Sequence, residues 1–231
     1  MKFNNDMLRL YAVTDRHWTG EQTLYEQVRD VLMGGATCLQ LREKDLDEAS
    51  FYEEAKNIKE LCRLFDVPFI INDNVMLAKE IDADGVHVGQ DDMACVKARE
   101  ILGPDKIIGV SAHTIEEARI AKEQGADYLG VGAIFPTSSK DDAEVLGIKR
   151  LKEMTETVDL PMVAIGGISY DNCLLLKDTG IDGIAVISAL FGQKNIKQAT
   201  IDLKKRVDAL YETMHTCLTI AGSDSSGGAG I

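Results

Sequence analysis

Three polar side chains near the end of one apolar segment are the first candidates for chemistry. Segment 38–44 begins as a strand, and Gln40, Arg42 and Lys44 occupy alternate positions towards its end. Alternate residues of a strand point to the same face, so these three should project together. An amide, a guanidinium and an ammonium aimed at one place suit an anion. The alternative is a strand end that carries ordinary surface charge into solvent.

Two carboxylates form a second candidate group. Asp73 and Asp92 each follow a short apolar segment, and both stand just before a stretch with helical periodicity. If the two segments are neighbouring strands, the carboxylates lie together beside the cations, an arrangement that suits Mg²⁺ bound through a diphosphate. The alternative for each aspartate is to cap the helix that follows.

A third candidate is the glycine pair Gly166-Gly167, together with Ser188 after a later apolar segment. Backbone N–H groups of a glycine turn, next to a helix start, can bind a phosphate. A tight turn between strand and helix would need the same glycines. If the chain forms a barrel of eight strands and eight helices, phosphate binding is favoured, because such barrels often bind a phosphate after their seventh and eighth strands.

The elements that must position these residues alternate regularly along the chain. We expect an α/β fold, a single-domain (β/α)₈ TIM barrel, because nearly continuous apolar strands alternate with eight helical stretches. No G-x-G-x-x-G follows the first strand, which argues against a Rossmann fold. In such barrels the active site lies at the carboxyl ends of the strands. The predicted strands are 8–14, 37–42, 68–73, 85–88, 107–110, 128–131, 162–165 and 183–187, and the predicted helices are 23–33, 48–65, 75–80, 93–102, 116–124, 148–156, 172–178 and 196–211.

Composition narrows the partners. The net charge of −13 over 231 residues disfavours nucleic-acid binding. An anionic ligand would therefore need a local positive pocket, because the overall field of the protein repels it. The chain shows no membrane-length apolar run and no signal peptide, so we expect a cytoplasmic protein. Its five cysteines are scattered, which predicts reduced thiols. The sequence leaves the oligomeric state open, including a homo-oligomer.

Several other residues have two readings. His87 lies mid-strand among valines, where a hydrogen-bonded core histidine is the better interpretation than a catalytic base. His113 at a strand end could equally touch a ligand or cap a helix. The long loop 132–147 could form a lid over the site or a solvated surface.

Taken together and in order, these motifs resemble the thiamine-phosphate synthase family over roughly residues 8–211. The resemblance implies a transferase of thiamine biosynthesis that joins a hydroxymethylpyrimidine diphosphate to a thiazole phosphate, releasing pyrophosphate. The family's mechanism is dissociative, with a pyrimidine methyl cation that the thiazole nitrogen attacks. The matching segments are LYAVTD (10–15), QLREK (40–44), IND (71–73), GVHVGQDD (85–92), GVSAHT (109–114), FPTSSK (135–140), AIGGI (164–168) and VISA (186–189).

The resemblance also implies roles for individual residues. Arg42, Lys44 and Lys140 would act on the departing diphosphate, and Asp73 and Asp92 would hold Mg²⁺. Glu43 should face away from its neighbours by strand alternation, so pairing with a nearby cation is the better expectation for its carboxylate. The expected substrate-binding residues are Gln40, Leu41, Arg42, Glu43, Lys44, Asn72, Ser111, Thr137, Ser138, Ser139, Lys140, Gly167, Ile187 and Ser188.

The end of the chain has a resemblance of its own. Residues 213–231 follow the expected barrel domain, 1–212, and resemble the opening of a hydroxymethylpyrimidine (phosphate) kinase. The stretch covers only the first strand and loop of such a kinase, so we expect no kinase activity from it. We interpret the chain as a fragment of a synthase–kinase fusion or as a shortened relative of one. A Gly/Ser-rich flexible tail is the alternative.

Two other functions compete with the synthase. A thiazole tautomerase on the same barrel would need the thiazole phosphate site alone, and the diphosphate and metal candidates argue against it. A non-catalytic sensor of phosphate ligands is the second alternative.

Overall fold

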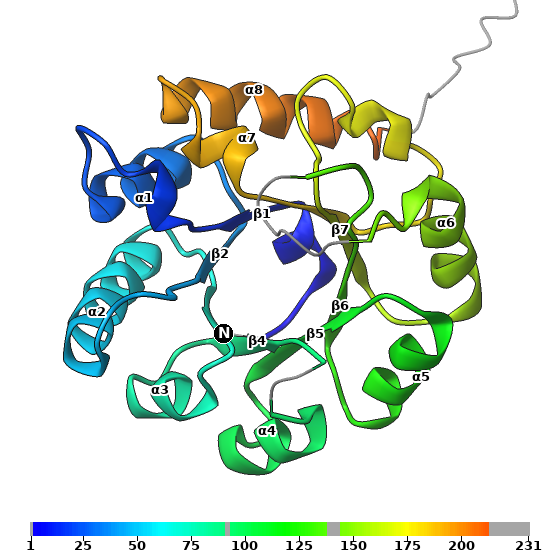
Figure 1. The fold of residues 1–231 in the computed structure, drawn as a ribbon, viewed down its shortest axis with the longest axis horizontal. Helices are drawn as coiled ribbons and strands as arrows, with labels where there is room; N and C mark the ends of the chain where they lie inside the picture. The colour runs from blue at the N-terminus through cyan, green and yellow to red at the C-terminus, as the bar shows by residue number, and fades with distance from the viewer. Residues whose placement is uncertain (1, 91–92, 138–143, 213–231) are drawn as a thin grey trace, which may run out of the picture.

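Eight parallel strands close into a barrel in the computed structural model, which describes residues 2–90, 93–137 and 144–212. Each strand pairs with the next along the chain, and the first pairs with the last, so the predicted (β/α)₈ barrel is confirmed (Figure 1). The strands are β1 (Leu10–Val13), β2 (Cys38–Leu41), β3 (Phe69–Asn72), β4 (Gly85–Val88), β5 (Ile107–Ala112), β6 (Tyr128–Val131), β7 (Met162–Ile165) and β8 (Gly183–Val186).

The helices surround the strands in Figure 1, as the alternation in the sequence predicts. Thr23 caps the first of them with a complete capping box, in which Glu26 returns the hydrogen bond. The α-helices are α1 (Leu24–Met33), α2 (Glu48–Leu64), α3 (Val75–Glu80), α4 (Cys95–Leu102), α5 (Ile115–Glu123), α6 (Gly147–Thr157), α7 (Ser188–Phe191) and α8 (Ile196–Asp208).

Three differences from the expected elements are found after the strands. The expected helix at 172–178 is a short 3₁₀ helix, η3 (Cys173–Leu176), and Asp178 beyond it has a left-handed φ of 61°. The additional helix α7 directly follows β8, where the sequence analysis placed no helix. Two more 3₁₀ helices flank the first strand: η1 (Asn5–Leu8) and η2 (Arg16–Trp18).

Strand alternation divides the apolar residues into two cores. Leu39 and Leu41 of β2 belong to the larger core between the strands and the helices, whereas Cys38 belongs to the smaller core inside the barrel. The same alternation places Tyr11 of β1 and Tyr128 of β6 inside the barrel. Residues with inward-pointing side chains are therefore the ones that can line a site at the barrel mouth.

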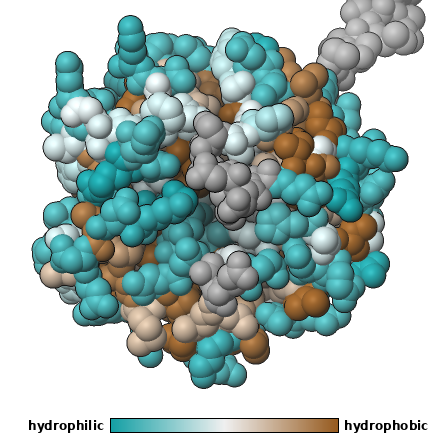
Figure 2. Space-filling view, in the orientation of Figure 1, coloured by the Kyte–Doolittle hydropathy of each residue, from teal (hydrophilic) through white to brown (hydrophobic). Residues whose placement is uncertain are grey.

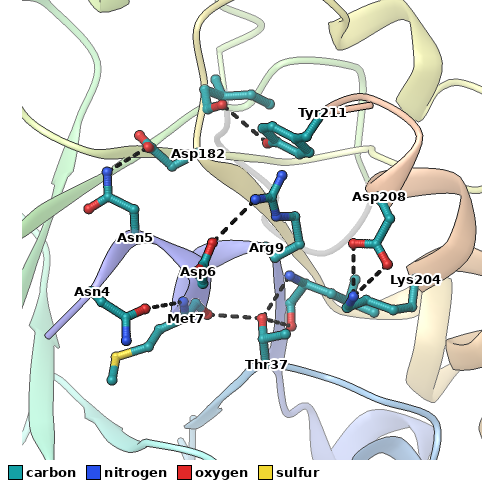
Figure 3. A network of polar contacts seen from close by, with 12 residues as sticks. Asn4, Asn5, Asp6, Met7, Arg9, Thr37, Asp182, Lys204, Asp208 and Tyr211 are labelled. Atoms are coloured by element: carbon teal, nitrogen blue, oxygen red, sulfur yellow. Dashed lines mark hydrogen bonds and ion pairs between the residues drawn. The ribbon is translucent and has the colours of Figure 1, made fainter. Parts of the chain in front are cut away.

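The amino end of the barrel is closed by η1 and by the end of α8 (Figure 3). Thr37 Oγ1 accepts from Leu10 N at 2.8 Å and reaches Met7 O at 3.0 Å, which ties η1 to β2. Arg9 stacks on the Tyr211 ring, 3.4 Å from its centroid. A shallow hollow of about 330 Å³ lies beside Arg9, Thr37 and Tyr211, far from the carboxyl ends of the strands. No helix in the described ranges has the length and apolarity to cross a membrane.

Candidate active site

A cavity of about 670 Å³ opens at the carboxyl ends of the strands. Figure 2 shows the hollow at the centre of this face with hydrophilic residues around it. Side chains or backbone from all eight strands or the loops after them border the cavity, so its walls come from the entire barrel. The sequence-predicted residues on its wall are Gln40, Arg42, Glu43, Lys44, Asn72, Asp73, Ser111, Thr137 and Ile187.

The row of polar residues on β2 has the predicted orientation. Gln40 points into the barrel and is almost fully buried, and Arg42 and Lys44 border the cavity above it. Thr14 accepts a hydrogen bond from the Arg42 backbone N–H at 2.9 Å, and Asp15 lies 3.7 Å from its guanidinium. Leu41 between them is fully buried in the outer core, so its side chain does not border the cavity. The rim therefore carries two cations, with an amide below them.

Glu43 is turned away from the β2 row into a partly buried ion pair. Its carboxylate accepts from Arg16 Nη2 at 2.6 Å and from Arg16 Nε at 3.2 Å, which confirms the expected pairing with a neighbouring cation. The same guanidinium also donates to Glu54 of α2. Glu43 touches the cavity wall, but only 2% of its side chain is exposed to solvent.

The charges in this cluster influence one another in opposite directions. Burial raises the pKa of Glu43 to about 7, against the lowering effect of Arg16, and the nearby Glu54 carboxylate adds to the rise. The hydrogen bond to Glu43 raises the pKa of Arg16, so the guanidinium stays charged. The pKa of Glu43 rises because two carboxylates share one guanidinium and the Glu43 side chain is withdrawn from water.

Asn72 and Asp73 meet at the end of β3. Asn72 Nδ2 donates to Asp73 Oδ2 at 2.8 Å, and both residues border the cavity. Asp73 does not cap the next helix, because Asn74 Oδ1 accepts from Leu77 N at 2.9 Å and fills that role. Asp73 has a left-handed φ of 63°, and its N–H donates to His87 O at 2.8 Å. The structural alternative of a helix cap is therefore wrong for this carboxylate.

The end of β3 supplies part of a metal-binding donor set. Asp73 and Asn72 supply oxygen atoms, the ligands that Mg²⁺ prefers when it also binds phosphates. Asp92, the second expected ligand, lies outside the described residues, and so do Ser138, Ser139 and Lys140. Within the ranges that the structure describes, no three His, Cys, Asp or Glu side chains gather as a self-sufficient metal site. The residues present fit an ion shared with a phosphorylated ligand.

A chain of hydrogen bonds forms the floor of the cavity. Gln40 Nε2 donates to the Tyr11 hydroxyl at 2.9 Å, and that hydroxyl lies 2.7 Å from the hydroxyl of Tyr128. Tyr128 is 3.1 Å from His87 Nδ1, and His87 Nε2 is 2.9 Å from Ser111 Oγ. His87 is therefore hydrogen-bonded, as expected, but it also borders the cavity. Burial raises the pKa of both tyrosines well above the ordinary value, so both remain neutral.

Two glycines make room for this floor. A Cβ on Gly109 of β5 would overlap the Tyr128 ring and reach 2.5 Å from His87 Nδ1. A Cβ on Gly130 of β6 would lie 3.0 Å from His87 Cε1. The tyrosines were missed by the sequence analysis. Two features could have indicated them: their position on the inward face of the strands, and the neighbouring glycines that leave space for large rings.

The candidate phosphate subsite lies on the opposite side of the mouth. Gly166 and Gly167 after β7 have left-handed φ values of 95° and 67°. A Cβ on Gly167 would overlap the carbonyl oxygen of Pro136, so the glycine allows the loops after β6 and β7 to meet. Thr137, Gly166 and Ile187 border the cavity, whereas Gly167 and Ser188 do not line it. The structure thus brings the two loops together, and two of the predicted residues are adjacent in sequence to residues that line the cavity.

Two further residues border the cavity in the described part of the chain. Arg150 of α6 adds a guanidinium that the sequence analysis did not single out. His113 also lies there, and its backbone N–H donates to Glu117 Oε2 at 2.6 Å. Thr114 caps α5, so capping is not the function of the His113 side chain.

Comparisons with known proteins agree with this geometry. The family model described as thiamine monophosphate synthase matches residues 10–190. A thiamine-phosphate synthase of Clostridium acetobutylicum is 49% identical over 189 residues, which cover 82% of this chain and 90% of the relative. One of Methanobrevibacter smithii is 47% identical over 206 residues, covering 89% and 98%. A solved thiamine phosphate pyrophosphorylase from Pyrococcus furiosus superposes with a TM-score of 0.84 at 43% identity, covering 90% and 99%.

Proposed function

Because the chain belongs to the thiamine monophosphate synthase family, we propose that the cavity described above is where thiamine phosphate is made. The enzyme's function is to join a pyrimidine diphosphate and a thiazole phosphate into thiamine phosphate, with release of pyrophosphate. The residues, the ion and the steps that follow are our proposal. The observation that carries it is the gathering of Gln40, Arg42 and Lys44 beside Asn72 and Asp73 around one cavity.

The pyrimidine diphosphate would bind on the side of β2 to β5. Arg42 and Lys44 supply positive charge at the rim, where the diphosphate would lie, and Lys140 is the third proposed cation. Gln40, Asn72 and Ser111 supply uncharged hydrogen-bonding groups deeper in the cavity. Leu41 can contribute only through its backbone, because its side chain is buried outside the barrel. Glu43 would act through its pair with Arg16, which fixes the backbone between the two rim cations.

Magnesium is the proposed cofactor. Asp73 and Asp92 would hold it, and Mg²⁺ when bound would reduce the negative charge of the diphosphate. Two findings support this assignment: Asp73 lines the cavity, and Asn74 caps α3 in its place.

The thiazole phosphate would bind on the side of β6 to β8. Thr137, Ser138 and Ser139 would contact it from the loop after β6, and Ile187 from the end of β8. Gly167 and Ser188 would offer backbone N–H groups to the phosphate, because each directly follows a residue that lines the cavity, Gly166 and Ile187. Binding both substrates in one cavity would replace an encounter in solution with a fixed alignment.

The proposed reaction is dissociative. The C–O bond to the diphosphate breaks, and pyrophosphate leaves with the electron pair while Arg42, Lys44 and Lys140 stabilise its charge. The remaining pyrimidine methyl cation accepts the lone pair of the thiazole nitrogen, which forms the new C–N bond. Such a step needs no side-chain nucleophile. It does need water to be kept away from the cation, which a cavity surrounded by the whole barrel favours.

Incubation of the purified chain with both substrates and Mg²⁺ tests this function. We expect thiamine phosphate and pyrophosphate in equal amounts, measured by mass spectrometry and a phosphate assay after pyrophosphatase treatment. Conversion of a thiazole isomer without formation of thiamine phosphate would identify a tautomerase. Binding of both ligands without reaction would identify a sensor.

The segment 213–231 lies outside the described residues, and its origin as the start of a kinase-like domain stays a proposal. A synthase–kinase fusion would supply the pyrimidine diphosphate to this barrel. Removal of residues 213–231 should leave the synthase rate unchanged, because the described barrel contains the cavity without them.

A further inference from the structure

The direction of the hydrogen bonds across the cavity floor can be worked out from the number of protons. The first bond runs from Gln40 to Tyr11, because the structure turns the amide nitrogen, which can only donate, towards the hydroxyl. Three bonds remain: Tyr11 to Tyr128, Tyr128 to His87, and His87 to Ser111. Each could run either way when taken alone.

Four protons are available for these three bonds. Each hydroxyl of Tyr11, Tyr128 and Ser111 brings one proton, and a neutral imidazole of His87 brings one more. One proton is therefore left over, and it belongs to a hydroxyl. If the bonds run from Tyr11 towards Ser111, the extra proton is on Ser111. If they run the other way, or converge on Tyr128, the extra proton stays on a tyrosine.

Burial distinguishes these arrangements. Tyr11 and Tyr128 are each 1% exposed, and a donor left unsatisfied at such a site is unfavourable. The thiol of Cys38 beside Tyr11 is only a weak acceptor. Ser111 is half-buried and borders the cavity, so a ligand or water can accept its proton. The favoured direction is Tyr11 to Tyr128 to His87 Nδ1, with His87 Nε2–H donating to Ser111.

We propose that Tyr11, Tyr128 and His87 are positioning residues that give the cavity floor a fixed polarity. They hold His87 as the Nε2–H tautomer, so Ser111 receives the imidazole proton and offers its own hydroxyl proton to a ligand. They also turn the Gln40 amide nitrogen to Tyr11, which leaves its carbonyl oxygen as the acceptor for a ligand. The floor thus selects a molecule with a donor, such as an amino group, at one end and an anionic oxygen at the other.

This proposal rests on the proposed function, which gives the two ends a use. An aminopyrimidine diphosphate has the required donor and the required anionic oxygens. The Ser111 hydroxyl would donate to the diphosphate as it leaves, when the oxygen at the breaking bond gains negative charge. The effect of the positioning residues should therefore appear mainly in kcat and should depend on Ser111.

The first experiment needs no substitution in the floor. The enzyme is labelled with ¹⁵N-histidine, and two-bond ¹H–¹⁵N spectra near neutral pH identify the tautomer of each ring. The signal of His87 is assigned by its loss in His87→Gln. We expect a neutral ring with the proton on Nε2. A ring with the proton on Nδ1, or with both nitrogens protonated, would overturn the proposed direction.

The second experiment is a double-mutant cycle with Tyr128→Phe and Ser111→Ala. Tyr128→Phe keeps the ring and removes only the hydroxyl, and we expect kcat to fall about tenfold with a smaller change in KM. In the Ser111→Ala background the same substitution should change kcat less than about twofold. Independent, multiplicative losses would show that Tyr128 does not act through Ser111 and would overturn the proposal.

Tyr211→Phe is the matched control, because it removes a hydroxyl bonded to Ile181 O at the opposite end of the barrel. We expect its kcat to stay within about twofold of wild type, and an equal loss there would count against a specific role for Tyr128. Thermal unfolding of each variant confirms that it is folded. Failure of the wild-type enzyme to form thiamine phosphate would instead contradict the proposed function, and it is measured separately.

Discussion

The buried carboxyl group of Glu43 should make the enzyme less stable as the pH rises. This side chain is 2% exposed and shares the guanidinium of Arg16 with Glu54. Withdrawal from water disfavours its charged form more than Arg16 favours it, so its pKa rises from 4.5 to about 7. The folded protein therefore holds a proton at Glu43 at pH values where the unfolded chain has lost it.

The sign and the size of the effect follow from this pKa. Because the folded value lies above the unfolded value, the stabilisation is complete below pH 4.5 and is lost as the pH rises through about 7. At roughly 1.4 kcal/mol per pH unit, the whole change is at most about 3.5 kcal/mol in the free energy of unfolding. Glu43→Gln keeps the shape, cannot ionise and should lack this part of the pH dependence.

The assay is urea denaturation followed by circular dichroism between about pH 4.5 and 8.5. We expect the stability of wild type, relative to Glu43→Gln, to fall by about 2–3 kcal/mol across this range. Glu53→Gln on the exposed side of α2 is the matched control and should keep the wild-type profile. Parallel profiles for wild type and Glu43→Gln would refute the reasoning. A wild type that gains stability with pH would show that the Arg16 pair outweighs burial.

Three further substitutions test the site. Arg42→Ala should lower kcat on the order of 100-fold in steady-state kinetics and change the free energy of unfolding, measured by urea denaturation, by only about 1 kcal/mol. Unfolding that accounts for the lost activity would contradict a direct role of Arg42 in the reaction. Asp73→Asn should raise the Mg²⁺ concentration for half-maximal activity at least about tenfold, and an unchanged Mg²⁺ titration would exclude Asp73 as a ligand. Gly167 has a left-handed φ of 67° and lies against the Pro136 carbonyl, so Gly167→Ala should lower the free energy of unfolding by about 2 kcal/mol or more. It should also raise the KM for the thiazole phosphate by a larger factor than the KM for the pyrimidine diphosphate. Equal KM changes would separate Gly167 from the thiazole phosphate.

The fold and the orientation of one strand could be predicted because they follow from periodicity. Eight apolar segments alternate with helical ones, and the barrel closes as expected. On β2 the alternation of side chains correctly places Gln40 inside and Leu41 outside. The turn of Glu43 away from the row follows from the same alternation. These are local properties of the chain.

The residues that were missed depend on contacts across the barrel. Tyr11 and Tyr128 lie 117 positions apart, and their hydrogen bond forms only because β1 and β6 face each other across the interior. Arg16 could be named as a charge at a strand end, but its two carboxylate partners come from β2 and α2. The choice of Asn74 over Asp73 as the cap of α3 depends on the backbone turn at Asp73. Sequence periodicity carries no information on such pairings.

The chemistry of the cavity divides between its rim and its floor. The rim carries the charged groups Arg42, Lys44 and Asp73, which suit a diphosphate, whereas the floor is built from neutral groups. Burial raises the pKa of Tyr11, Tyr128 and Cys38 well above their ordinary values, so neither tyrosinate nor thiolate forms beneath the ligand. A pyrimidine methyl cation would react with such anions. A floor that offers hydrogen bonds without a nucleophile would therefore protect the cation until the thiazole nitrogen reaches it.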